Sequence, residues 1–149
     1  FRNLTVLDNI KSAFEVQKLA QRELSSKTEE IIEDFDISSI TSQKGSELSG
    51  GQRRRVEIAR SIALNPKFIM LDEPFAGIDP IAILELKKLI KKLSNKGLGI
   101  LISDHNVKAT MDICSEIFII SEGSIISRGT PDEVSNNKLV KETYLGEER

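Results

Sequence analysis

Two hydrophobic patterns alternate along the chain. Short apolar runs, at residues 67–71 and 97–103, are typical of strands that are buried on both faces. Around these runs, apolar residues recur at the spacing of amphipathic helices. Strands that alternate with helices predict an α/β fold in which crossover helices join parallel strands. The expected helices cover residues 5–22, 28–35, 49–64, 81–93 and 107–114.

Local signals place the ends of these elements. Ser49 stands at the start of the third helix and Gln52 follows at the spacing of a capping box. Pro80 opens the fourth helix after Asp79, which is expected to cap it. Residues 38–47 are polar without periodicity and predict a loop. The remaining pattern predicts a hairpin of residues 117–121 and 124–128, then short helices at 131–134 and 138–144.

Composition narrows the class of protein. A length of 149 residues suits about one domain, and 39% hydrophobic with 30% charged residues is ordinary for a globular chain. The net charge of -2 gives no electrostatic reason to expect binding to nucleic acid or to an anionic membrane. The single cysteine, Cys114, excludes an internal disulfide framework. Because the chain opens at Phe1 within an apolar–polar pattern, we expect it to be a piece of a longer polypeptide.

Residues 48–52, Leu-Ser-Gly-Gly-Gln, form what we call the glycine corner. Gly50 and Gly51 let the backbone approach a bound group closely and present its bare N–H groups. The following helix directs its positive end at the same place, and Ser49 adds a hydroxyl group. This combination suits a phosphate.

Three arginines follow the glycine corner on the same helix. Arg53 lies in the first turn, where it would neighbour a bound phosphate. Arg54 and Arg55 are expected on a solvated helix face, which is the usual role of a charge run.

Asp72 and Glu73, called here the acidic strand end, follow an apolar run and precede Pro74. In open α/β folds, ligands bind at the carboxyl ends of the strands. Asp72 suits Mg²⁺, which takes one or two carboxylates together with phosphate oxygens and water. Glu73 projects differently and is suited to polarise a water for in-line attack on a terminal phosphate.

His105, the only histidine, follows the second predicted strand. A lone histidine is usually structural, but an imidazole at this edge of the sheet can hydrogen-bond a γ-phosphate and respond to its presence. Its neighbour Asp104 is expected to cap the next helix.

In order and spacing, these motifs resemble those of ABC transporter ATP-binding subunits. The glycine corner is similar to the signature motif, residues 68–72 to the Walker B strand, and Glu73 to the catalytic glutamate. Residues 76–79 resemble the D-loop, and His105 the switch histidine. The resemblance implies a partial P-loop NTPase core with an α-helical subdomain. It divides the chain into a helical subdomain (1–48), a core (49–114) and a C-terminal hairpin with short helices (115–149).

Longer matches point to one branch of the family. The stretches that look like the ATPase of the bacterial lipopolysaccharide export system are residues 53–60, 72–80, 103–107 and 144–148. ATPases of branched-chain amino acid importers are the nearest alternative. A soluble ABC ATPase of translation or DNA repair is a third reading. A second signature or a coiled-coil insertion would favour it, but neither occurs in the sequence.

The resemblance implies a head-to-tail homodimer that binds two ATP molecules with Mg²⁺ and drives transmembrane permease subunits at the cytoplasmic face of the inner membrane. Asp72 would hold the metal, and Glu73 and His105 would act in catalysis on the subunit's own ATP. The helical subdomain would receive a coupling helix of the permease. By the resemblance, Ser49, Gly50 and Gly51 would bind the partner's ATP. Gln52 and Asp79 are also implied in nucleotide binding.

No G-x-x-x-x-G-K-[ST] phosphate loop occurs in the sequence. In the family this loop, the adenine-stacking aromatic residue and the Q-loop glutamine all lie before the position of Phe1. We therefore expect this chain alone to hold ATP poorly and its sheet to have unpaired edges. A catalytically incompetent module, which binds another chain's nucleotide through its glycine corner, remains an alternative to an ATPase fragment.

Overall fold

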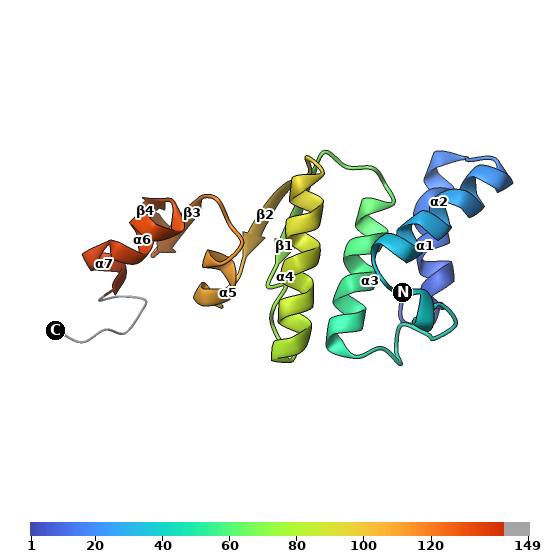
Figure 1. The fold of residues 1–149 in the computed structure, drawn as a ribbon, viewed down its shortest axis with the longest axis horizontal. Coiled ribbons are helices and arrows are strands. Elements are labelled where there is room, and N and C mark those ends of the chain that lie inside the picture. The colour runs from blue at the N-terminus through green and yellow to red at the C-terminus, as the bar shows by residue number, and fades with distance from the viewer. Residues whose placement is uncertain (142–149) are drawn as a thin grey trace. The chain divides into compact units, whose positions relative to one another are not determined.

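The structure, a computed structural model, describes residues 1–141, and its elements are labelled in Figure 1. The chain forms two units, one of residues Phe1–His105 and one that starts at Asn106. The first unit contains α1 (Val6–Phe14), η1 (Glu15–Gln17), α2 (Gln21–Asp34), η2 (Ser38–Ile40), α3 (Gly50–Ile62), β1 (Phe68–Asp72), α4 (Pro80–Asn95) and β2 (Gly99–Ser103). The second contains α5 (Val107–Met111), β3 (Ile117–Ser121), β4 (Ser124–Gly129), α6 (Pro131–Asn136) and α7 (Lys138–Val140).

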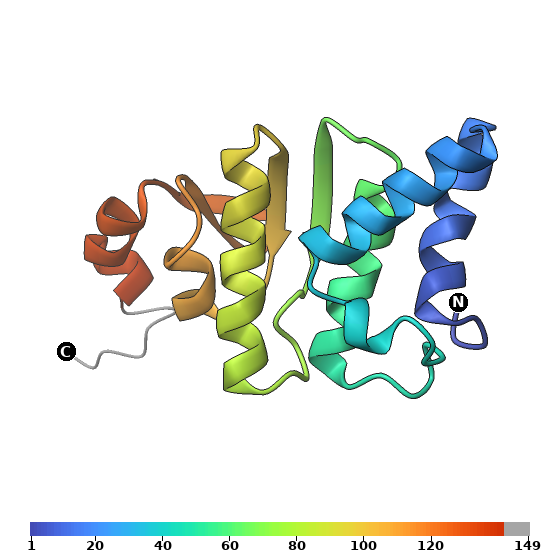
Figure 2. The ribbon, with the colours of Figure 1, turned by 45° about the vertical axis from the view of Figure 1, so that its right-hand side comes forward.

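The helices α1, α2 and α3 pack together in the first unit, with α1 in contact with both of the others (Figure 2). Their apolar faces meet because each helix carries its large side chains at helical spacing. The buried side chains of this part of the core include Val6, Ile10, Phe14, Phe35, Ile37, Val56 and Ile58.

The first expected helix is broken in the structure. The sequence predicts one helix over residues 5–22, but α1 ends at Phe14 and a single 3-10 turn, η1, follows it. Lys18 then takes a left-handed conformation with φ of 50° and donates its backbone N–H to the Glu15 carbonyl at 3.3 Å. A left-handed residue cannot continue a right-handed helix, so the chain turns here.

The second helix begins earlier than its serines suggest. The sequence predicts a start at residue 28, whereas α2 starts at Gln21 and includes Ser25 and Ser26. Thr28 is buried inside this helix and donates its hydroxyl to the Leu24 carbonyl at 2.7 Å. Back-bonding of this kind satisfies a hydroxyl within a helix, so these polar residues do not mark a boundary.

The polar stretch 38–47 is more ordered than a free loop. It contains the short 3-10 helix η2, and Lys44 forms an isolated antiparallel bridge with Thr5. Gly45 and Ser46 donate their backbone N–H groups to the carbonyls of Leu4 and Arg2, at 3.0 and 2.9 Å. These bonds hold the start of the chain beside the segment that enters the glycine corner.

The strands β1 and β2 pair in parallel, as predicted, and α4 connects them along the chain. Their register places Asp72 opposite Ser103 at the carboxyl ends. Among residues 1–141, β1 pairs with β2 and with no other strand. The outer edges of this pair are therefore unpaired in the part of the chain that the structure describes, as expected.

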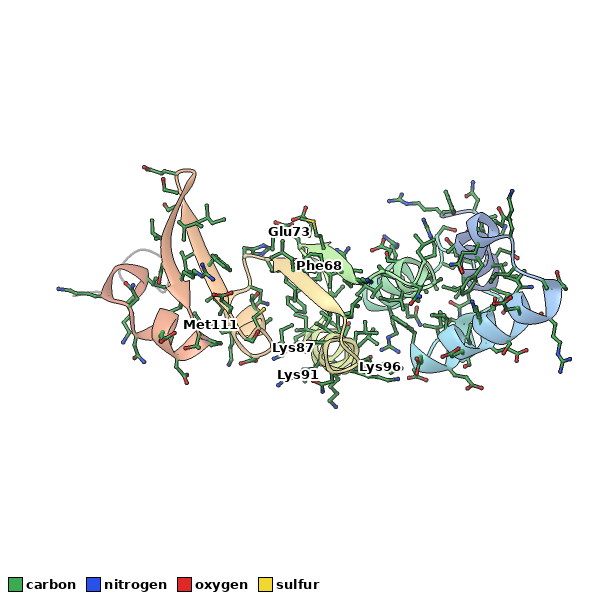
Figure 3. All side chains as sticks on the ribbon, turned by 90° about the horizontal axis from the view of Figure 1, so that it is seen from above. Phe68, Glu73, Lys87, Lys91, Lys96 and Met111 are labelled. Atoms are coloured by element: carbon green, nitrogen blue, oxygen red, sulfur yellow. The ribbon has the colours of Figure 1, made fainter. Side chains whose placement is uncertain are left out.

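The expectation that both faces of these strands are buried is wrong for the described chain. The helix α4 covers one face, whereas Phe68 and Glu73 lie on the other side (Figure 3). Phe68, Met70 and Leu101 are 55%, 73% and 46% exposed. Both faces of each strand are apolar in sequence, so the pattern alone does not show which face a helix covers.

The helix α4 forms as the local signals predict. Asp79 caps it, and its carboxylate accepts the backbone N–H groups of Ile81 and Ala82 at 3.0 Å each. Its buried face consists of Leu86, Leu89, Ile90 and Leu93.

Two lysines join the far end of α4 to the end of α2. Lys92 and Lys96 contact the Asp34 carboxylate at 2.9 and 2.7 Å. The hydrogen bonds from Lys96 and Lys92 lower the pKa of Asp34 below its ordinary value, which keeps this carboxylate charged. The pair of contacts fixes α4 against the helical part of the unit.

The second unit has a core of its own. The antiparallel pair β3–β4, with a register shift at Ile119/Ile120, forms the predicted hairpin. The small core beneath it contains Ile117, Ile119, Val134 and Val140, and Cys114 packs against it. Burial raises the pKa of the Cys114 thiol, in keeping with a packing residue. The helix α7 covers part of the predicted 138–144 segment, and residues 142–149 lie outside the described residues.

Candidate functional site

The glycine corner forms the predicted capping box at the start of α3. The Ser49 hydroxyl oxygen accepts the backbone N–H of Gln52 at 3.3 Å, and the Gln52 side-chain oxygen accepts the backbone N–H of Ser49 at 3.0 Å. A cap of this kind stabilises a helix by about 1 kcal/mol. The Ser49 hydroxyl acts as an acceptor in this box, so its own hydrogen remains a donor for a ligand.

Gly50 and Gly51 bring α3 against the start of α4. A Cβ atom on Gly50 would lie 2.9 Å from Cγ2 of Ile78 and 3.1 Å from the Gly77 carbonyl oxygen. One on Gly51 would lie 2.6 Å from Cβ of Ala82. The sequence predicts these glycines as bare backbone for a bound group, and the structure adds that they let two helix starts approach closely.

Replacing Gly51 by valine should separate these helix starts. The added side chain meets Ala82 at a distance that no Cβ contact tolerates, so the start of α3 must move. Overpacking of this kind costs about 1–3 kcal/mol, which should appear as a lower midpoint in urea unfolding. Ala82→Gly supplies the matched background, because it removes the Cβ atom that the new side chain would meet, so Gly51→Val should cost less there. An equal loss from Gly51→Val with and without Ala82→Gly would show that the helix contact is not the cause.

A cleft of about 320 Å³ is lined by the starts of α3 and α4 and by the segment 36–40. Its lining brings together four of the residues that the resemblance assigns to nucleotide binding, and Arg55 lies beside them. The four are Ser49, Gly51, Gln52 and Asp79.

Asp72, Glu73 and His105 lie together at the carboxyl ends of β1 and β2. Ser103 donates its hydroxyl to the Asp72 carboxylate at 2.5 Å, across the register that pairs the two residues. The His105 Nδ1 atom lies 3.5 Å from a Glu73 carboxylate oxygen. The side chains of His105 and Glu73 are 74% and 59% exposed, so both are accessible to a ligand.

The backbone at Glu73 turns sharply away from the strand. Glu73 has a φ of 43°, in the left-handed region that a residue with a side chain rarely adopts. Its N–H donates to the Ser103 carbonyl at 2.7 Å, which continues the strand ladder past Asp72. The two carboxylates of the acidic strand end have different neighbours, Ser103 for Asp72 and His105 for Glu73.

Asp104 has a different role from the one expected. Its side chain is fully buried and accepts the backbone N–H of Phe75 at 2.9 Å. The cap of α5 is Asn106, whose side-chain oxygen accepts the Ala109 N–H at 3.0 Å. Asp104 thus ties the turn after Glu73 to the end of β2, a long-range contact that no local spacing indicates.

Arg54 and Arg55 do not lie on a solvated face. Arg55 is 20% exposed and contacts Glu85 at 2.5 Å and Asp36 at 3.5 Å. Arg54 is 29% exposed and donates to the backbone carbonyl of Glu73 at 3.0 Å. The sequence prediction fails here because the partners lie far along the chain.

Arg53 stays at the glycine corner. Its guanidinium donates to the backbone carbonyl of Leu48 at 3.4 Å. This contact fits the expectation that Arg53 neighbours the corner.

The donor set fits Mg²⁺ only in part. Within residues 1–141, no group of three or more His, Cys, Asp and Glu side chains is arranged to hold a metal. Asp72 with Ser103 at the sheet edge supplies one carboxylate and one hydroxyl. Mg²⁺ in phosphate-transfer sites takes one or two carboxylates and completes its shell with phosphate oxygens and water, so these residues fit an ion that arrives with a nucleotide.

In the described residues no helix is both long and apolar enough to cross a bilayer.

Comparison with known proteins identifies the family. The family model "ABC transporter" matches residues 1–76, about half of the chain, and "Branched-chain amino acid ATP-binding cassette transporter" matches residues 124–149. The lipopolysaccharide export system ATP-binding protein LptB of Haemophilus influenzae is 52% identical over 149 residues, 99% of this chain and 62% of that protein. LptB of Escherichia coli K12 is 46% identical with the same coverage. The chain thus spans about 62% of the length of these curated relatives.

Solved structures agree with the sequence matches. The ADP conformation of MJ1267, an ATP-binding cassette of an ABC transporter, is 28% identical with a TM-score of 0.81, over 98% of this chain and 64% of that one. CbiO1 of Clostridium perfringens, part of the ABC transporter complex cbiONQ, is 28% identical with a TM-score of 0.84, over 97% and 58%. The predicted partial P-loop NTPase fold is confirmed. The parallel strands agree with these matches, and the chain belongs to the ABC transporter family, in its ATP-binding domain.

Proposed function

We propose that this chain is part of an ATPase subunit that powers lipopolysaccharide export. The similarity to two LptB proteins, at 52% and 46% identity, supports the cargo. One observation supports the chemistry: Asp72, Glu73 and His105 meet at the ends of two paired strands, where Glu73 and His105 lie 3.5 Å apart.

In the proposed reaction, water attacks the γ-phosphate of ATP, and ADP and inorganic phosphate leave. Glu73 accepts a proton from this water as the new P–O bond forms and the bond to ADP breaks. The imidazole of His105 hydrogen-bonds the γ-phosphate beside it. Asp72 would hold Mg²⁺, and a bound ion would supply positive charge to neutralise the phosphate oxygens. The exposure of Glu73 and His105 supports these roles, since both side chains are accessible to a nucleotide.

The glycine corner serves the second nucleotide of a head-to-tail homodimer in this proposal. Ser49 donates its hydroxyl, and Gly50 and Gly51 present backbone N–H groups, to the γ-phosphate bound to the partner subunit. Gln52 fixes the corner through the capping box, and Asp79 fixes the start of α4 beside it. The shared cleft of Ser49, Gly51, Gln52 and Asp79 supports a common binding surface.

The remaining assignments follow from the same proposal. Residues 1–48 form the helical subdomain, 49–114 the core and 115–149 the C-terminal part. The partners are two transmembrane permease subunits, one of which sends a coupling helix to the helical subdomain. The complex lies at the cytoplasmic face of the bacterial inner membrane.

Complementation tests the cargo. The complete encoded polypeptide should restore growth to an Escherichia coli strain depleted of LptB, and its Glu73→Gln variant should not. The variant controls for expression, because it changes one carboxylate to an amide of the same size. If both proteins are produced in equal amounts and neither restores growth, the result would argue against lipopolysaccharide export.

Import of branched-chain amino acids is the second candidate. The match of residues 124–149 to the "Branched-chain amino acid ATP-binding cassette transporter" model is the observation that favours it. Leucine uptake in a strain that lacks its own importer ATPase distinguishes the two. Restored uptake without restored growth in the LptB-depleted strain would favour the importer.

A further inference from the structure

The side chain of Arg54 contacts the main chain of Glu73. Its Nη2 atom donates to the Glu73 carbonyl at 3.0 Å, and its Nη1 atom pairs with the Glu57 carboxylate at 3.0 Å. The Arg54 side chain as a whole is 29% exposed, so it is partly shielded from water. The contact joins residues 19 positions apart and connects α3 to the end of β1.

Both the N–H group and the carbonyl group of Glu73 are hydrogen-bonded. The Glu73 N–H bonds the Ser103 carbonyl at 2.7 Å, and the Glu73 carbonyl accepts from Arg54 and from the Ala76 N–H at 3.2 Å. The left-handed φ of 43° is unfavourable for a residue that carries a side chain. Such a conformation persists only where surrounding contacts enforce it, and the charge-assisted bond from Arg54 is one of these contacts.

The direction of the Glu73 carboxylate depends on this backbone. The Glu73 side chain is 59% exposed, and the His105 imidazole, whose Nδ1 atom lies 3.5 Å from its carboxylate, is 74% exposed. Neither burial nor a tight pair therefore fixes the carboxylate. Its position follows from where the main chain places Cα and Cβ.

We propose that Arg54 is a positioning residue for hydrolysis, which holds the main chain of Glu73 so that the carboxylate faces the attacking water. This inference rests on the proposed function and deepens it. Arg54 lies on α3, the helix that Ser49 caps, so one element carries both the end of the glycine corner and the support of Glu73. A shift of α3 is thereby transmitted to the acidic strand end.

Steady-state ATP hydrolysis by the complete encoded polypeptide tests the proposal. Arg54→Gln should lower kcat about 10- to 100-fold, the usual loss when a group that orients a catalytic residue is removed. KM for ATP should change less than about threefold, because Arg54 does not contact the nucleotide. Arg54→Lys, which keeps one cationic donor, should recover part of the rate. The control Glu57→Gln removes the ion pair but leaves the bond to Glu73, and should stay within about twofold of wild type.

A double variant separates positioning from a general effect on folding. If Arg54 acts through the Glu73 carboxylate, Arg54→Gln should not slow the residual rate of Glu73→Gln any further. An equal additional loss in that background would overturn the proposal. So would a wild-type kcat in Arg54→Gln, or a loss in Glu57→Gln as large as that in Arg54→Gln. In each of these cases, an active wild type together with an inactive Glu73→Gln variant still supports the proposed function. An inactive wild type would overturn both the proposed function and the positioning role of Arg54.

Discussion

The Glu73→Gln variant of the complete polypeptide should bind ATP and hydrolyse it about 100- to 10,000-fold more slowly than wild type. Glutamine preserves the size of the side chain but cannot take a proton from water, and this range is typical for loss of a general base. Glu73 is 59% exposed, so the change leaves no buried group unpaired. Phosphate release at saturating ATP measures the rate, and a fluorescent ATP analogue measures binding.

A matched control is available on the same unit. Glu29 lies on the exposed side of α2, and Glu29→Gln makes the same chemical change away from the strand ends. It should leave hydrolysis within about twofold of wild type, as is usual for surface substitutions. Wild-type hydrolysis by Glu73→Gln would exclude Glu73 as the base.

Asp104→Ala should cause the largest loss of stability. The Asp104 side chain is fully buried and accepts the N–H of Phe75, a residue that is itself 3% exposed. Removing the carboxylate leaves this amide without its partner, at a cost of about 2–3 kcal/mol. Urea unfolding should show a lower midpoint with an unchanged m-value.

Asparagine at the same position separates the hydrogen bond from the charge. Asp104→Asn keeps an oxygen that can accept the Phe75 N–H. Its loss of unfolding free energy should therefore be less than half of the loss caused by Asp104→Ala. If the free energy of unfolding of Asp104→Ala lies within about 0.5 kcal/mol of the wild-type value, the contact with Phe75 does not stabilise the turn.

The parts that the sequence predicts well are those set by neighbours along the chain. Ser49 with Gln52, and Asp79 before Pro80, are caps whose partners lie within one helical turn, and the structure confirms both. The parallel pairing of β1 with β2 follows from the alternation of strands and helices. The positions of Asp72 and Glu73 at a strand end follow from the apolar run before them.

The parts that the sequence misses depend on distant partners. The contacts of Arg54 with Glu73, of Arg55 with Glu85 and of Asp104 with Phe75 join residues 19, 30 and 29 positions apart. Charge type alone does not show which side chain faces a neighbour. The left-handed backbone at Glu73 has no glycine to signal it.

The exposed strand face has another cause. Phe68 and Met70 lie on one side of β1, and the described chain covers only the other side. Local sequence carries no information on what covers a face.

We propose that each nucleotide is shared between two subunits, and the most direct test of this proposal mixes two inactive variants. Glu73→Gln removes the base and Ser49→Arg blocks the glycine corner, so neither variant alone should hydrolyse ATP. If each nucleotide lies between the acidic strand end of one subunit and the glycine corner of the other, a mixed dimer has one intact site. At equal amounts with free exchange, mixing should restore up to about a quarter of the wild-type rate, since half of the dimers are mixed. No recovery at any ratio, in dimers shown to exchange, would place both parts of the site in one subunit and contradict the account.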